Sequence, residues 1–160
     1  MIKYRSLQDK DIKDIQQIAL KCWLDTYRDI YKEKTIRKTV ANYYSTEKLM
    51  NNLSDIKKNT EWFCVVLDSD NIVGYSHIGK KDKDWEIFRI YILPKYQRKG
   101  IGSQLIKKGE KFLVSKKAKK YIVHPHIKNK LAIQFYKKVG FRRMSAKDRG
   151  STSPCFLKTI

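Results

Sequence analysis

The sequence predicts an α/β domain with a mixed central β-sheet and helices packed on its faces. The chain has 160 residues, of which 41% are hydrophobic, so one domain over residues 1–160 can bury a single core. Strand and helix patterns alternate along it without a repeat or a linker. A strand-like run also ends at Pro94 and leads into a glycine-rich turn, "PKYQRKGIG", that opens a helix.

The N-terminal part is predicted to form one strand, residues 2–7, and three helices. Asp9 can cap the first helix and Ser45 the third. Each helix has one apolar face, which indicates packing on a core. These faces are Ile12, Ile15, Ala19, Cys22 and Trp23, then Ile36, Val40 and Tyr43, then Leu49, Leu53 and Ile56.

The rest of the chain is predicted to supply most of the sheet. Strands are expected at residues 61–67, 71–78, 85–93, 121–124, 141–146 and 155–160, with turns at 68–71, 80–84 and 147–154. One helix carries Ile101, Leu105, Gly109 and Phe112 on its buried face. A last helix, within residues 129–141, carries Leu131, Phe135 and Val139, and Gly140 ends it in a left-handed conformation.

The glycine turn has the features of an anion site. The first amides of a helix have no helical acceptor, and the helix dipole makes that end positive. Gly100 and Gly102 allow a phosphate to approach the backbone, and Arg98 and Lys99 add charge. The GxGxxG and GxxxxGK[ST] nucleotide motifs are absent, so a turn that only connects strand to helix is the alternative.

Two motifs in sequence order resemble the GNAT superfamily of N-acetyltransferases. The first is the strand followed by "PKYQRKGIG", and the second consists of Asn129, Tyr136, Gly140 and Phe141. The resemblance covers essentially the whole chain. The segments "CWLDTYRDIY" and "EIFRIYILPKYQRKGIG" are similar to PaiA-type spermidine/spermine acetyltransferases. A GNAT-like mixed central sheet with two splayed parallel strands, flanked by helices, is therefore expected.

The resemblance implies that acetyl-CoA binds where the strands within residues 86–93 and 121–124 splay apart, and it implies no metal. Backbone groups of Ile90, Tyr91 and Ile92 would then pair with the pantetheine arm. The residues expected around the pyrophosphate and the rest of the coenzyme are Gln97, Arg98, Lys99, Gly100, Ile101, Gly102, Ser103, Asn129 and Tyr136.

Acetyl transfer to an amine makes three demands on the protein. A free alkylamine has a pKa of about 10.4, so a base or a desolvating channel must remove its proton before attack. The backbone amide of Ile92 is the candidate donor to the oxyanion, and Tyr136 is the candidate acid for the thiolate. The alternative for Tyr136 is an aromatic ring packed on its helix.

The candidate bases are Glu86, at the head of one strand, and His124, at the end of its neighbour. For both, a polar residue facing solvent is the alternative, and a water relay could replace either. PaiA-type sequences usually carry a second acid where this chain has Phe88, which weakens a scheme with two carboxylates.

The expected acceptor is a primary amine, with a polyamine favoured. Carboxylates interleaved with aromatic rings could hold one through ion pairs and cation–π contacts. These residues are Trp23, Asp25, Tyr27, Asp29, Tyr31 and Glu33. For each of them the alternative is a solvated helix face or a core aromatic, and a protein or peptide amine is the other acceptor considered.

The formal net charge of +20 favours anionic partners. A nucleic-acid-binding regulator is therefore an alternative, although its basic residues would be clustered and the lysines here are scattered. A CoA-binding sensor without activity is another. With no apolar run long enough for a membrane span and no signal-peptide pattern, a cytoplasmic monomer or homodimer is expected. Cys22, Cys64 and Cys155 fit reduced thiols or one disulfide.

Overall fold

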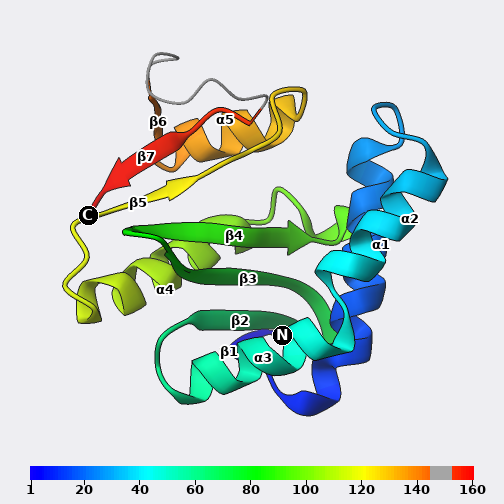
Figure 1. The fold of residues 1–160 in the computed structure, drawn as a ribbon, viewed down its shortest axis with the longest axis horizontal. Helices are drawn as coiled ribbons and strands as arrows, with labels where there is room; N and C mark the ends of the chain where they lie inside the picture. Colours follow the sequence, from blue (N-terminus) through cyan, green and yellow to red (C-terminus); the bar gives the residue numbers. More distant parts are fainter. Residues whose placement is uncertain (145–152) are drawn as a thin grey trace.

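The computed structural model describes residues 1–144 and 153–160, and these form a seven-stranded sheet with helices on both faces (Figure 1). The strand order is β1-β2-β3-β4-β5-β7-β6. The strands are β1 Ile2–Ser6, β2 Trp62–Asp68, β3 Asn71–Lys81, β4 Asp84–Ile92, β5 Lys120–Val123, β6 Arg142–Arg143 and β7 Phe156–Thr159. The helices are α1 Ile12–Tyr27, α2 Glu33–Tyr43, α3 Thr46–Lys57, α4 Ile101–Ser115 and α5 Lys130–Lys138, with short 3-10 turns η1 Asp9–Asp11 and η2 Pro94–Tyr96.

The sheet is mixed, because β4 and β5 are parallel while its other neighbouring strands are antiparallel. The parallel pairing covers only Glu86 with Ile122 and Ile87 with Val123. Beyond it β5 ends, and β4 continues to Ile92. The predicted splay between two parallel strands is therefore confirmed.

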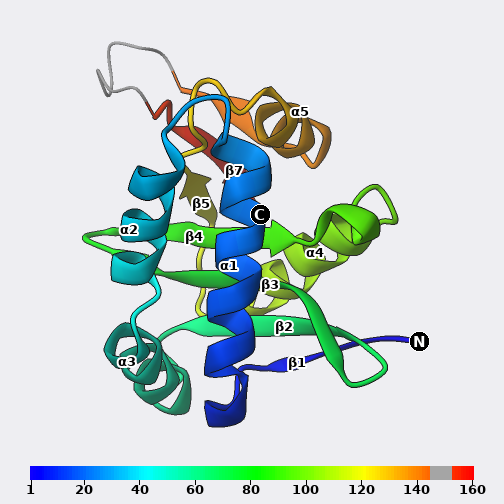
Figure 2. The same ribbon diagram turned by 90° about the vertical axis from the view of Figure 1, so that its right-hand side faces the viewer.

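Helices α1, α2 and α3 pack on one face of the sheet, and α4 and α5 pack on the other (Figure 2). On the first face Ile15 of α1 and Leu49 of α3 meet Phe63 of β2 in one cluster. On the second face Leu105 of α4 is fully buried beside β2 and β3. None of the helices in the described ranges has the length and apolar character that crossing a membrane requires.

Two of the expected apolar faces were assigned partly wrongly. Tyr43 is 55% exposed, because the stripe of Ile36 and Val40 continues to Tyr44, whose ring packs edge-on against Tyr75. Leu131 is 76% exposed. The buried face of α5 centres on Tyr136, and Leu131 lies in the first turn at the flank of that face.

The expected turn at 80–84 is also shorter than predicted. The ladder between β3 and β4 continues through charged residues to the pair Lys81–Asp84, so the turn contains two residues. Asp82 there has φ +55°, a left-handed conformation that Asp tolerates. Of the expected terminal strands, β6 and β7 are observed, and residues 145–152 lie outside the described residues.

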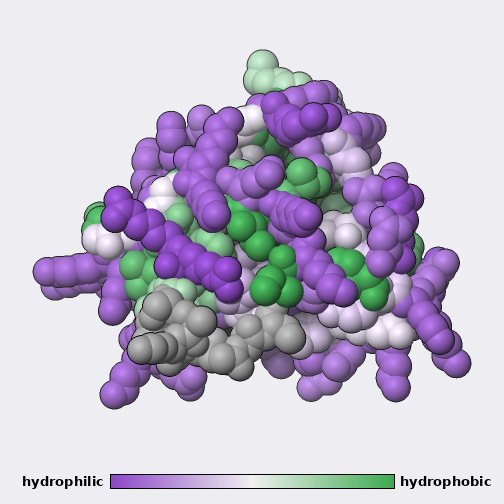
Figure 3. Space-filling model, turned by 90° about the horizontal axis from the view of Figure 1, so that it is seen from above, coloured by the Kyte–Doolittle hydropathy of each residue, from purple (hydrophilic) through white to green (hydrophobic). Residues whose placement is uncertain are grey.

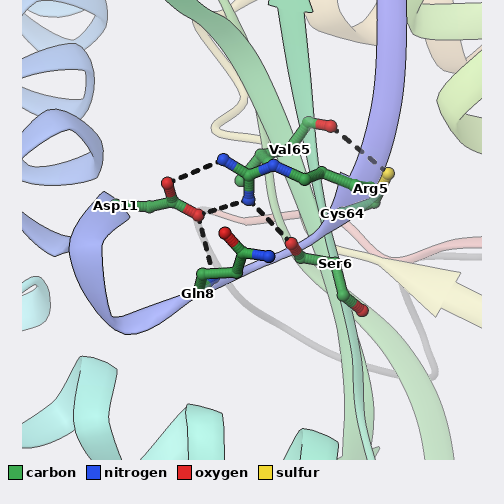
Figure 4. Close-up of polar contacts among 6 residues, drawn as sticks. All are labelled: Arg5, Ser6, Gln8, Asp11, Cys64 and Val65. Atoms are coloured by element: carbon green, nitrogen blue, oxygen red, sulfur yellow. Dashed lines mark hydrogen bonds and ion pairs between the residues drawn. The ribbon is translucent and has the colours of Figure 1, made fainter. Parts of the chain in front are cut away.

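Ser45 caps α3 as predicted, since its hydroxyl accepts the amide of Lys48 at 3.3 Å. The expectation for Asp9 is wrong, because Asp9 lies in the η1 turn and Asp11 occupies the position before α1. The carboxylate of Asp11 is 2% exposed and accepts two bonds from Arg5, at 2.6 and 2.8 Å (Figure 4). It also accepts the amide of Gln8 at 2.8 Å, so it ties β1 to the start of α1.

Replacing Asp11 by Ala should lower the free energy of unfolding by about 3 kcal/mol, because it leaves the Arg5 guanidinium partly buried without its partner. Ser45→Ala, which removes only a helix cap, should cost about 1 kcal/mol. Urea denaturation of both variants measures the two effects. Equal losses would contradict the idea that the Arg5–Asp11 fork has a larger role than an ordinary cap.

Candidate active site

A cavity of about 90 Å³ lies where β4 and β5 separate. Its wall combines Tyr27 of α1, residues 87–91 of β4, residues 123–126 at the end of β5, and three residues of the α5 region, namely Asn129, Ala132 and Tyr136. Both faces of the sheet therefore contribute to it.

The edge of β4 presents backbone groups to the gap. The amide of Leu93 donates to Val73 of β3 at 2.9 Å, so Leu93 and Tyr91 direct their backbone groups toward β3. By the alternation of a strand, Ile90 and Ile92 direct theirs toward the side that β5 has left. The carbonyl of Ile92 accepts Nε2 of Gln97 at 2.9 Å. The amide of Ile92 thus faces the gap, whereas Tyr91 contributes its side chain.

The turn after β4 leads into α4 with the geometry of an anion cradle. Gly100 has φ +80° and precedes the helix, and a Cβ built there would meet nothing within 4 Å. The amide of Gln104 bonds to the carbonyl of Gly100 at 3.1 Å. The amides of residues 101–103 precede that first helical bond, so they have no acceptor within the helix. Arg98 and Lys99 are exposed beside them.

Gly102 is buried, and the absence of a side chain there leaves room for a neighbouring ring. A Cβ at this position would lie 3.0 Å from two ring atoms of Phe135 in α5 and 3.5 Å from Ile92. Gly102 therefore lets the starts of α4 and α5 approach each other. Its amide remains among those without an acceptor in the helix, and the approach of a phosphate to it stays a prediction.

Asn129 and Tyr136 are held by α5. Asn129 caps this helix, since its Oδ1 accepts the amide of Ala132 at 3.0 Å. Tyr136 lines the cavity and is 5% exposed. Burial raises the pKa of its hydroxyl above the usual value, and the nearby Tyr27 adds to the rise. Tyr136 therefore keeps its proton at neutral pH.

The structure brings together the two residues that we considered separately as bases. Nδ1 of His124 lies 2.9 Å from Oε1 of Glu86, and the side chains are 24% and 12% exposed. His124 lines the cavity, whereas Glu86 lies behind it and does not.

The expected acceptor residues fall into two groups. Tyr27 lines the cavity, and burial raises the pKa of its hydroxyl while the nearby Asn129 and Tyr91 side chains oppose the rise. Tyr31 follows α1, and its hydroxyl lies 2.8 Å from Nε2 of His126. Tyr31 and the other four residues do not line the cavity. Trp23 packs in the core beside Tyr27, Asp25 and Asp29 are exposed, and Glu33 pairs with Arg37 on the surface of α2.

The sequence analysis missed His126 and Arg89, which also line the cavity. Arg89 is anchored by Asn52 Oδ1 at 3.2 Å and by the carbonyl of Tyr43 at 3.0 Å, and its guanidinium lies over the Tyr44 ring. The position of His126 two residues after His124 was the available signal. In the described ranges, three or more metal-ligating side chains do not come together at any site.

A sheet opened between two parallel strands, with amides free of helical acceptors beside the opening, is the arrangement expected of an acyltransferase that uses coenzyme A. A family model, the acetyltransferase (GNAT) family, matches residues 13–141. The chain therefore belongs to the GNAT family and is an N-acetyltransferase that uses acetyl-CoA.

Known proteins support this assignment. The chain is 28% identical over 142 residues to the spermidine N(1)-acetyltransferase of Thermoplasma acidophilum, with 88% of each chain covered. The crystal structure of the PaiA N-acetyltransferase from Thermoplasma acidophilum in complex with coenzyme A aligns with a TM-score of 0.93 and 26% identity, over 100% of this chain and 99% of the other. A GNAT acetyltransferase from Staphylococcus aureus shares the fold, with a TM-score of 0.80 and 14% identity over 99% of each chain.

Gly102→Val should lower the free energy of unfolding by about 1–3 kcal/mol, because the added carbons collide with Phe135. In a Phe135→Leu background this cost should shrink. Gly100→Ala is the matched control, since its cost of about 1 kcal/mol comes from the left-handed backbone and not from a neighbour. A double-mutant cycle by urea denaturation measures the coupling. An unchanged cost of Gly102→Val in the Phe135→Leu background would refute the packing role.

Proposed function

We propose that the acceptor of this N-acetyltransferase is a polyamine such as spermidine or spermine. The observation that carries the proposal is the similarity to a spermidine N(1)-acetyltransferase over 88% of both chains. Spermidine and spermine are flexible amines that carry several positive charges, and their primary amines are the proposed nucleophiles.

The described residues fit acetyl-CoA. The unpaired edge at Ile90 and Ile92 suits an extended pantetheine arm, which can add to an open strand edge. The amides of residues 101–103, with Arg98 and Lys99 exposed nearby, suit a pyrophosphate. Acetyl-CoA supplies the thioester carbonyl that the amine attacks directly, through a tetrahedral intermediate.

The chain provides a hydrogen-bond donor for each charge that develops. The amide of Ile92 faces the gap and is the proposed donor to the oxyanion. Tyr136 is the proposed donor to the departing thiolate. Because burial keeps the Tyr136 hydroxyl protonated, it can share its hydrogen throughout the reaction.

The acceptor side of the cavity is rich in rings. Tyr27 and Tyr31 contact the ring of His126, with centroid distances of 5.9 and 5.7 Å, and Phe88 also lines the cavity. Aromatic faces attract alkylammonium groups. Glu86 is the carboxylate just behind this wall. The exposed Asp25 and Asp29 are proposed to attract the distal amines from outside and not to grip the reacting one.

The surface agrees with a small acceptor better than with nucleic acid. The face that carries α5 is largely hydrophilic, with a smaller group of hydrophobic side chains in its middle (Figure 3). Two exposed apolar residues, Ile127 and Leu131, lie just before α5 and in its first turn. Insertion of apolar side chains among the basic ones weakens a continuous phosphate-binding stripe.

Tyr136→Phe should lower kcat about 100-fold, because the departing thiolate loses its hydrogen-bond donor. The affinity for acetyl-CoA should stay within about twofold, since the ring and its packing remain. Tyr121→Phe is the matched control, because the Tyr121 hydroxyl bonds Glu110 outside the cavity and its loss should leave kcat unchanged. Steady-state kinetics and coenzyme titration test this, and an undiminished kcat in Tyr136→Phe would remove Tyr136 from the mechanism.

Release of free CoA from acetyl-CoA, followed with a thiol reagent, tests the acceptor. Spermidine and spermine should give kcat/KM values at least about tenfold above those for a lysine-containing peptide, because only the polyamines fit a small aromatic cavity while offering distal charges to Asp25 and Asp29. A preference for the peptide would contradict the polyamine proposal and leave the N-acetyltransferase assignment intact.

A further inference from the structure

We propose that His124 is the base that accepts the proton of the acceptor ammonium, and that Glu86 is the positioning residue that orients the His124 ring. The proposal rests on the transfer to a primary amine proposed above. The sequence offered Glu86 and His124 as alternative bases, and the proposal gives each of them a different role.

The tautomer of His124 follows from its contact with Glu86. A carboxylate can only accept hydrogen bonds, so the ring nitrogen 2.9 Å from Oε1 of Glu86, Nδ1, must carry the hydrogen. The other nitrogen, Nε2, then keeps its lone pair. Among the described residues, the one hydrogen bond of the His124 ring is this bond through Nδ1, so Nε2 has no partner. A histidine held in this way is ready to take a proton.

The places of His124 and Glu86 in the structure also indicate different roles for them. His124 lines the cavity and Glu86 does not, although their side chains touch. Glu86 and Ile122 form one of the two residue pairs between β4 and β5, so the strands fix this carboxylate at the point where they begin to separate. His124 follows directly after β5 and therefore lies at the mouth of the splay. An amine in the cavity can therefore contact the imidazole and not the carboxylate.

His126 is a natural comparison within the same cavity, because both of its nitrogens are occupied. Its Nδ1 accepts the amide of Lys128 at 3.2 Å, so Nδ1 has no hydrogen. Its Nε2 therefore carries the hydrogen and donates it to the hydroxyl of Tyr31 at 2.8 Å. Of these two histidines, only His124 has a ring nitrogen with a free lone pair, and His126 instead hydrogen-bonds Tyr31.

His124, water and the CoA thiolate together account for both protons that the acceptor ammonium loses. The ammonium gives one proton to Nε2 of His124, which passes it to water, and the neutral amine attacks the thioester carbon. The C–N bond forms, and the C–S bond then breaks. The second proton leaves the adduct nitrogen and ends on the thiolate, beside the Tyr136 hydroxyl. One ammonium and one thioester thus yield one amide, one thiol and one free proton.

The test uses the full-length protein with spermidine, or with another amine that the wild type acetylates. His124→Ala should lower kcat about 100-fold with the KM for acetyl-CoA nearly unchanged, and added imidazole should restore at least about tenfold of that loss. His126→Ala is the matched control: it should chiefly raise the KM for the amine, and imidazole should not restore it. Coenzyme titration and thermal unfolding show whether each variant is folded.

Glu86 is tested by two further variants. Glu86→Gln keeps the shape of the side chain but can offer its amide hydrogens to the ring, so kcat should fall about tenfold or more. Glu86→Asp, which keeps the carboxylate, should recover part of that loss. The KM for acetyl-CoA should change little in either variant, as expected for an effect exerted through His124.

Three results would overturn the proposal. They are a folded His124→Ala enzyme with undiminished kcat, a loss in His124→Ala that imidazole does not restore, and a Glu86→Gln enzyme with wild-type kcat. None of these results contradicts the proposed polyamine acceptor, because the acceptor is tested by comparing amines with the wild-type enzyme. Conversely, if another amine proves to be the acceptor, the rescue experiment with that amine still decides the role of His124.

Discussion

The site depends on one constraint, the early end of β5. Backbone amides and carbonyls inside a protein need partners, and a parallel ladder would normally supply them along the whole of β4. Here the ladder has two residue pairs. The backbone groups of Ile90 and Ile92 are left facing a gap, and the carbonyl of Ile92 is bonded by Gln97. An open strand edge beside a cavity can bind an extended ligand, as the acetyl-CoA of this family requires.

The two faces of the sheet supply different chemistry to this opening. On one face, α4 begins with amides that have no acceptor within the helix, Gly102 lets Phe135 of α5 pack against the start of α4, and Tyr136 of α5 lines the cavity. On the other face, α1 and the segment after it bring Tyr27 and Tyr31 toward His126. This arrangement agrees with our proposal that the coenzyme binds mainly on the α4 side and the amine on the α1 side, with Glu86 and His124 between them.

Much of the fold could be predicted because it depends on local patterns. The alternation and spacing of apolar residues located the helices, and Pro94 and Gly140 marked ends that backbone geometry imposes. The errors occur where contacts with other elements determine which residue is buried. Tyr44 is buried in place of Tyr43 because its ring packs against the ring of Tyr75. Leu131 is exposed because α5 directs Tyr136 toward the core. Helical periodicity alone cannot choose between adjacent residues at the end of a stripe.

By itself, the sequence determined the order of the elements and the glycine turn that carries the coenzyme motif, because both arise from interactions within a few residues. Only the tertiary structure decided that Glu86 and His124 form one pair, although 38 residues separate them. It also decided that Phe135 packs over Gly102 and that His126 hydrogen-bonds Tyr31, 95 residues away in the chain. These contacts depend on strand register and helix packing, which no local pattern encodes.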